Sequence, residues 1–220
     1  MLSKKTFSYI LMGCGVCFAA GGQAYGFDYA RYNAGYSQGI KLSVSDDQVL
    51  AGAKSFVGSV AQRGIDFLSD DKITPERRKA EFRKLLKDSF AMKSLGRFAL
   101  GRYWRTSTAA QRQEYLKLFE EMVLDVYASR FGEYTDQTFD IRDIRKEGKS
   151  DSLVTSFIVP KSGPEIQVDW RVRYKNKKYL VVDVIVEGVS MAVTQRSDFS
   201  SVIQRGGGKV DVLIAHLREN

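Results

Sequence analysis

The residue types that most often carry catalysis are scarce in this chain. Among its 220 residues there are one histidine and two cysteines. Both cysteines, Cys14 and Cys17, lie in an apolar N-terminal stretch, and the histidine, His216, stands four residues from the end, near Leu213 and Leu217. Thiol catalysis and cysteine-ligated metals are thereby excluded for the rest of the chain, and a single histidine argues against another transition-metal site. We expect neither a metal nor any other cofactor.

Two carboxylates remain as candidate general bases. Asp183 lies among aliphatic residues, where a charge is costly unless it is paired, and Asp169 lies on the polar face of the preceding strand. A buried carboxyl in a cone-shaped α+β fold can act as a base, as in ketosteroid isomerases, so a small-molecule enzyme using Asp183 is one hypothesis. We favour a structural ion pair of Asp183 with Arg102, Arg105 or Arg171, because structural pairs perturb carboxylates as catalytic sites do.

Two aromatic residues, Tyr103 and Trp104, lie between Arg102 and Arg105. Rings flanked by arginines can stack on nucleic-acid bases, but more commonly they are core residues whose polar tip reaches a partner, and we adopt the second interpretation. The formal net charge of +8 is spread along the chain without a recognisable nucleic-acid motif. We therefore expect no nucleic-acid partner. The charge indicates a solvated basic surface, or attraction to anionic lipid head groups or acidic partner surfaces.

Residues 165–191 predict two neighbouring strands. Apolar residues alternate in the first half, which places one set on one face of a strand: Ile166, Val168, Trp170, Val172 and Tyr174. After a polar turn at 175–178, residues 179–186 are apolar on both faces except at Asp183. A strand of this kind must be covered on both sides or must line a cavity.

Helix start signals precede the strands. Ser45 or Asp46 can cap a first helix, Thr74-Pro75 begins a second, and Thr108 with Gln111 has the spacing of a capping box. Helices are predicted over residues 46–68, 75–90, 92–104 and 109–131, with short ones near 199–203 and over 210–217. Two further strands are predicted at 138–144 and 152–159. This order predicts an α+β fold in which helices are segregated from a four-stranded antiparallel sheet.

The N-terminal residues have the pattern of a secretory signal peptide. Lys4 and Lys5 precede an apolar run at 7–20, and small residues follow up to Gly26. The run is too short for an ordinary membrane span; an uncleaved anchor and a lipobox at 11–14 are the alternatives. We expect a signal peptide at 1–26, a flexible lead-in at 27–44 and one domain at 45–220, with a helical part at 45–132 and the sheet and C-terminal helices at 137–218.

Several segments in the same order resemble one family. They are FALGRYWR at 98–105, QRQEYLKLFEEMVLDVY at 111–127, DVIVEGVS at 183–190, RSDF at 196–199 with Ile203, and residues 208–217. Together they resemble the MlaC family, the periplasmic phospholipid-binding component of the Mla lipid-transport system, once called a toluene-tolerance family. The resemblance covers roughly residues 49–217 and rests on the combination of motifs rather than on any single one.

The resemblance implies a carrier rather than an enzyme. Members of the family have a curved antiparallel sheet wrapped by helices around an apolar pocket for acyl chains. The implied protein is periplasmic and exchanges phospholipid with an outer-membrane lipoprotein–porin complex and an inner-membrane ABC transporter complex, which maintains outer-membrane lipid asymmetry. A related branch is associated with hopanoids, and that ligand is an alternative here.

Strand alternation and the two central helices supply the expected pocket residues. For each of them an ordinary place in the core is the competing interpretation, because a wide apolar helix face usually packs against a neighbour. The expected lipid-binding residues are Phe98, Tyr103, Trp104, Phe119, Val123, Tyr127, Trp170, Val172, Val182, Val184, Val186 and Met191.

Overall fold

The computed structural model describes residues 45–70, 72–128 and 137–219, with the side chains of residues 127 and 128 excepted. The predicted signal peptide and lead-in lie outside these residues and stay predictions. The helices are α2 (Asp46–Leu68), α3 (Pro75–Ser89), α4 (Met92–Leu100), α5 (Tyr103–Thr106), α6 (Ala109–Ala128), α7 (Met191–Arg205) and α8 (Val210–Glu219). The strands are β1 (Thr138–Glu147), β2 (Asp151–Val159), β3 (Ile166–Lys175), β4 (Lys178–Val186) and β5 (Val189–Ser190).

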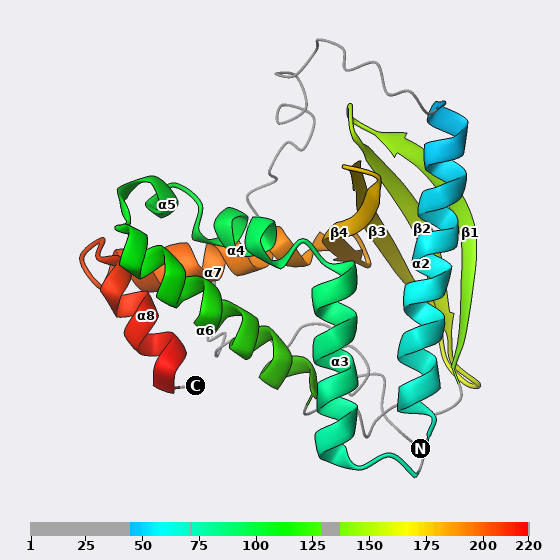
Figure 1. Cartoon of the computed structure of the whole chain (residues 1–220), viewed down its shortest axis with the longest axis horizontal. Coiled ribbons are helices and arrows are strands. Elements are labelled where there is room, and N and C mark those ends of the chain that lie inside the picture. The colour runs from blue at the N-terminus through cyan, green and yellow to red at the C-terminus, as the bar shows by residue number, and fades with distance from the viewer. Residues whose placement is uncertain (1–44, 71, 129–136, 220) are drawn as a thin grey trace.

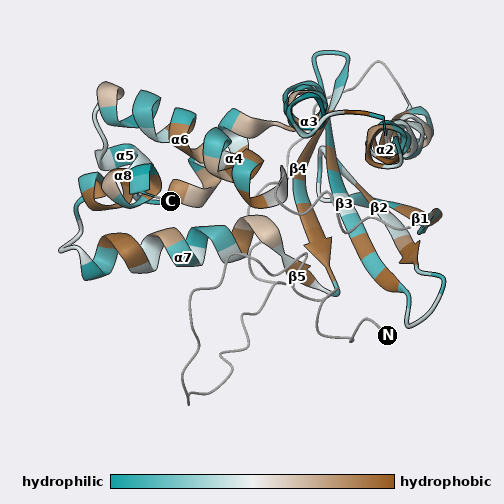
Figure 2. Cartoon of the chain, turned by 90° about the horizontal axis from the view of Figure 1, so that it is seen from below, coloured by the Kyte–Doolittle hydropathy of each residue, from teal (hydrophilic) through white to brown (hydrophobic). Residues whose placement is uncertain are grey.

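The elements form two parts that lie side by side (Figure 1). In one part α2 and α3 run over one face of the sheet, and Figure 2 shows both helices nearly end-on above the strands. In the other part α4 to α8 pack against each other beyond the β4 edge. The predicted α+β class is confirmed.

The sheet is an antiparallel meander in the order β1-β2-β3-β4-β5. Its register places Val154, Trp170 and Val184 beside one another across three strands. The four expected strands are present. The two-residue β5 is a fifth strand at one edge, which sequence alternation did not predict because two residues show no period. No helix within the described ranges has the length and apolar character needed to cross a membrane.

The predicted helix starts are confirmed by their hydrogen bonds. Ser45 and Gln48 form a capping box, the Thr74 hydroxyl accepts from the amide of Arg77, and Thr108 and Gln111 bond reciprocally. These contacts satisfy amides that have no partner within the helix.

Two helix boundaries differ from the prediction. The helix predicted over 92–104 is divided at Gly101, whose φ of 58° is readily adopted by glycine. The helix expected near 199–203 begins earlier, at Met191, because Ser190 caps it by accepting from the amide of Val193.

The described residues form two separate apolar cores. The first lies between α2 and the sheet and is centred on Ala53, Val57, Val154 and Val172. The second is formed by α4 to α8 around Tyr115, which is fully buried and donates its hydroxyl proton to the Gly96 carbonyl at 2.9 Å. Burial raises the pKa of Tyr115. Each part can therefore hold its own shape, and the space between the parts need not be filled.

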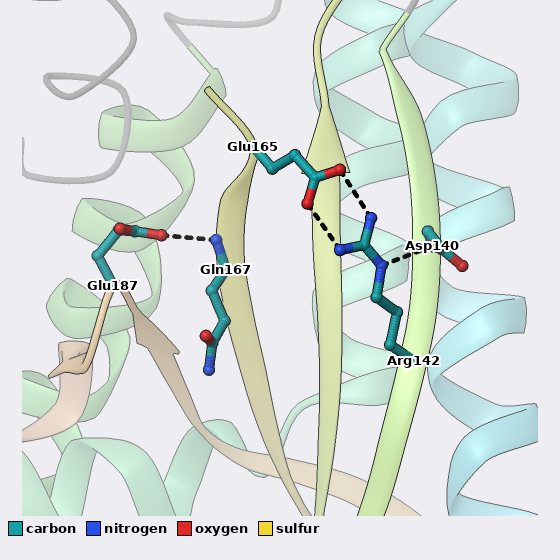
Figure 3. A network of polar contacts seen from close by, with 5 residues as sticks. All are labelled: Asp140, Arg142, Glu165, Gln167 and Glu187. Atoms are coloured by element: carbon teal, nitrogen blue, oxygen red, sulfur yellow. Dashed lines mark hydrogen bonds and ion pairs between the residues drawn. The ribbon is translucent and has the colours of Figure 1, made fainter. Parts of the chain in front are cut away.

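Exposed ion pairs connect the strand ends. Arg142 donates to both carboxylate oxygens of Glu165, at 2.6 and 2.8 Å, and to Asp140 at 2.8 Å, while Glu187 accepts from the amide of Gln167 at 2.6 Å (Figure 3). Arg142 lowers the pKa of Glu165 by hydrogen bonding. Such exposed contacts contribute little to stability; they link β1 and the β4–β5 turn to the start of β3.

Candidate functional site: an apolar cavity between the two cores

A cavity of about 430 Å³ lies where the two parts meet. This volume is within the range of about 300–1,000 Å³ that is usual for ligand pockets. Its wall is shared by α2, α3, α4, α6, the β3–β5 strands and the start of α7, and is apolar except at Asp183, Thr194 and Gln195.

Helix α2 has a different role in each half. In the first half Ala53 and Val57 are fully buried against the sheet. In the second half Val60, Ala61 and Phe67 line the cavity. One apolar stripe of α2 thus serves first as core and then as cavity wall.

Trp170 forms the sheet side of the cavity without presenting a free polar group. Its indole N–H donates to the Ser156 hydroxyl at 3.0 Å, and that hydroxyl donates to the Val168 carbonyl at 2.9 Å. Ser156 is fully buried. A buried N–H without a partner would be costly, so this internal pairing leaves the ring as a purely apolar surface.

Asp183 joins β4 to the start of α7 at the cavity wall. Its carboxylate accepts from the Ser190 hydroxyl at 2.6 Å and from the Ala192 amide at 3.1 Å. Burial raises the pKa of Asp183, although these two bonds and the Arg171 charge act in the opposite direction. A carboxylate at a helix N-terminus is also favoured by the helix dipole.

The expected ion pair of Asp183 with an arginine is not what holds this carboxylate. Arg171 is its cross-strand neighbour but makes its ion pair with Glu147, at 3.4 Å. Arg102 lies in another part of the surface, beside Tyr103. Asp183 is nevertheless structural, as the favoured interpretation held, because both of its oxygens bond to the residues that begin α7.

Asp169 lies away from the cavity. It follows the alternation of β3, so it projects from the face opposite Trp170. Its carboxylate accepts from the Thr155 hydroxyl at 2.6 Å and from the side-chain amide Nε2 of Gln167 at 3.0 Å. Within the part of the chain that the structure describes, no three His, Cys, Asp or Glu residues gather as metal ligands would.

Five of the expected pocket residues meet at the cavity, and they come from four elements, α6, β3, β4 and α7. These five are Phe119, Val123, Trp170, Val184 and Met191. Whether they contact a ligand stays a prediction.

The remaining expected residues lie elsewhere. Tyr103 is buried in the helical core, and Val172 is buried between the sheet and α2. Phe98 and Trp104 face a shallow surface hollow on the other side of α4. Val182 and Val186 are in β4 but outside the cavity lining, and the side chain of Tyr127 is outside the described residues.

Sequence reasoning missed the contribution of α2, α3 and the inner side of α4. Their apolar faces were recognised as faces but were attributed to ordinary helix packing. A helix stripe shows which residues avoid water, and no signal in the pattern distinguishes a wall from a core. The missed apolar side chains are Val60, Ala61, Phe67, Leu68, Phe82, Leu85, Leu86, Phe90, Met92, Leu95, Ala99, Met122, Val126, Val189 and Ala192.

The fold and the cavity together define a class of α+β protein with an internal apolar chamber between a sheet and a helical cluster. A family model described as "MlaC protein" matches residues 59–219. The chain belongs to the MlaC family, as the sequence motifs predicted.

The proteins to which this chain is similar include one curated relative and one solved structure. The intermembrane phospholipid transport system binding protein MlaC of Haemophilus influenzae is 24% identical over 129 residues, which are 57% of this chain and 59% of that protein. The match thus covers less than two-thirds of that relative. The structure of a phospholipid-binding protein from Ralstonia solanacearum in complex with a phospholipid has a TM-score of 0.67 at 22% identity, over 76% of this chain and 95% of that one. This likeness shows a shared fold.

Proposed function

We propose that the protein is a non-enzymatic phospholipid carrier that holds acyl chains in the cavity between its two cores. The observation that carries the proposal is the cavity itself, with a volume of about 430 Å³ and an almost entirely apolar wall. The named function of the Haemophilus relative and the phospholipid in the Ralstonia structure support it.

The physical need for such a cavity follows from the cost of exposing lipid to water. Each buried methylene is worth about 0.8 kcal/mol, so two acyl chains of ordinary length represent on the order of 20 kcal/mol. Free lipid therefore does not cross an aqueous gap at a useful rate. A carrier has to offer a comparable apolar environment without binding so tightly that release fails, and non-directional contacts with aliphatic and aromatic side chains suit this task.

The proposed acyl-chain contacts come from both sides of the cavity. Trp170 and Val184 would supply the sheet side, and Phe119, Val123 and Met191 the helical side. Because Trp170 already has its hydrogen-bond partner in Ser156, this ring needs nothing polar from a ligand. The proposed carrier acts in the periplasm. There it exchanges phospholipid with an outer-membrane lipoprotein–porin complex and an inner-membrane ABC transporter complex.

Lipid extraction tests the proposal directly. The full chain is expressed in a Gram-negative host and purified from the periplasm, and an organic extract is analysed by mass spectrometry. We expect phospholipid from the wild type and little or none from Val123→Trp, because an indole added to the wall occupies the chamber. Val193→Trp is the matched control, since Val193 is 49% exposed and outside the cavity lining.

Three results would contradict the proposal. One is lipid-free wild-type protein that also fails to take lipid from phosphatidylethanolamine–phosphatidylglycerol vesicles. The second is full lipid content in a folded Val123→Trp variant. The third is an extract that contains hopanoid in place of phospholipid, which would assign the chain to the hopanoid-associated branch.

A further inference from the structure

A hollow on the outer side of α4 is lined by arginines and aromatic rings. Helix α4 presents Met92, Leu95 and Ala99 to the cavity, whereas other residues of the same helix face this hollow. No acidic residue lines it; the lining consists of Ser94, Arg97, Phe98, Gly101, Arg102, Trp104, Arg105 and Arg196.

Ring stacking holds most of these guanidinium groups in place. Arg97 lies over the Trp104 ring at 5.8 Å from its centroid, Arg196 over the Phe98 ring at 5.3 Å, and Arg102 over the Tyr103 ring at 4.9 Å. Arg112 also stacks on Trp104, at 5.3 Å, and donates to the Trp104 carbonyl at 2.8 Å. A guanidinium stacked on a ring keeps its N–H edges free to bind an anion.

Gly101 allows Arg196 to lie close to the backbone at this point. A Cβ atom at Gly101 would be 2.9 Å from Nε of Arg196, and the φ of 58° further disfavours other residues. The glycine that divides α4 from α5 therefore also shapes the hollow.

Several arginines elsewhere among the described residues have carboxylate partners. Arg142 pairs with Glu165, Arg173 with Asp151 at 2.7 Å, and Arg218 with Glu114. Among the described residues, none of the four arginines that line the hollow takes part in an ion pair. The hollow thus concentrates positive charge that the fold itself does not neutralise.

We propose that this hollow binds the phosphodiester groups of anionic phospholipid head groups at a membrane surface. The fork of a guanidinium matches two phosphate oxygens, and basic side chains near an anionic bilayer are attracted to it. Charge complementarity favours this occupant, because four guanidinium groups and no carboxylate line the hollow. The proposal does not depend on what the cavity holds.

Vesicle sedimentation with paired arginine variants tests this site. Binding of the full chain is measured to phosphatidylcholine vesicles with and without phosphatidylglycerol. Arg102→Gln/Arg105→Gln should lower the partition coefficient for the anionic vesicles by about tenfold or more, since each basic residue adds severalfold. Arg77→Gln/Arg145→Gln removes the same charge from exposed positions outside the hollow and should have a much smaller effect.

Further measurements distinguish the proposed head-group site from a folding defect, a free-phosphate site and a site for acidic polypeptides. Arg105→Gln alone should already weaken binding, which guards against a folding defect in the double variant. Equal losses of vesicle binding in the two double variants would overturn the proposal. So would inhibition of vesicle binding by glycerol phosphate at the same concentration as the lipid phosphate. An arginine-dependent preference for poly-glutamate over anionic vesicles would also overturn it. Val123→Trp should bind vesicles like the wild type, and Arg102→Gln/Arg105→Gln should keep its extractable lipid, so the two proposals can fail separately.

Discussion

Helix α4 has an apolar cavity on one side and an arginine-lined hollow on the other. The cavity wall has few hydrogen-bonding groups, and those at Trp170 and Asp183 are satisfied within the protein. In the hollow most of the charged groups are held by ring stacking, and none has a carboxylate partner among the described residues. The difference shows that one nine-residue helix can separate two kinds of surface. The cavity wall suits apolar chains without a fixed geometry, and the hollow suits anionic groups.

The largest effect is expected when a charge is placed on the wrong side of α4. Leu95→Lys places an ammonium group at the cavity wall, where an uncompensated buried charge costs about 3–5 kcal/mol. Ser94→Lys, the neighbouring residue, places the same group at the exposed hollow and should change stability by less than about 0.5 kcal/mol. Urea unfolding of both variants measures the contrast, and similar costs would show that the two sides do not differ as described.

A smaller loss is expected from Gly96→Ala, which affects the packing of α4 on α6. A Cβ atom there would be 2.8 Å from the Leu116 side chain and 3.1 Å from Phe119, and overpacking of this kind costs about 1–3 kcal/mol. Gly58→Ala is the control, because its Cβ would meet Ile141 at an ordinary 3.7 Å. That variant should be neutral or more stable by up to about 1 kcal/mol. Denaturation midpoints that move equally in both variants would contradict the close approach.

Removing the ring that supports two arginines should have a still smaller effect on stability. Trp104→Leu loses the stacking of Arg97 and Arg112, and each such interaction is worth about 0.5–1 kcal/mol at an exposed site. Extractable lipid should be unchanged because Trp104 does not line the cavity, whereas binding to phosphatidylglycerol vesicles should weaken. Loss of extractable lipid without loss of vesicle binding would contradict this prediction and would show that Trp104 supports the cavity and not the hollow.

The smallest effect is expected in the pH dependence of Asp183→Asn. Burial raises the pKa of Asp183, so the folded protein binds this proton more readily than the unfolded chain. The contribution of Asp183 to stability should therefore fall as the pH rises from the ordinary carboxyl pKa to the raised one, and then stay level. The difference in unfolding free energy, wild type minus Asp183→Asn, should follow this course in urea titrations at several pH values. A difference that rises over the same range would mean that hydrogen bonding outweighs burial.

Much of the fold was predictable because its signals are local. The caps at Ser45, Thr74 and Thr108 need only the residues within one helical turn, and the alternation in β3 needs only the pleat of a strand. The division at Gly101 was less visible, since a glycine in a helical pattern indicates either a bend or close packing. In the structure Gly96 allows close packing, whereas Gly101 marks the bend.

The sequence by itself determined most of the helix starts, the order of the four main strands, the α+β class and the family, because each depends on periodicity, capping or motif order along the chain. Only the tertiary structure decided which apolar residues line a cavity and which fill a core. Val57 and Val60 occupy the same stripe of α2, yet the first packs on the sheet and the second faces the chamber. The physical reason is that hydrophobicity along the chain reports avoidance of water, whereas a cavity depends on how far apart two finished cores are held.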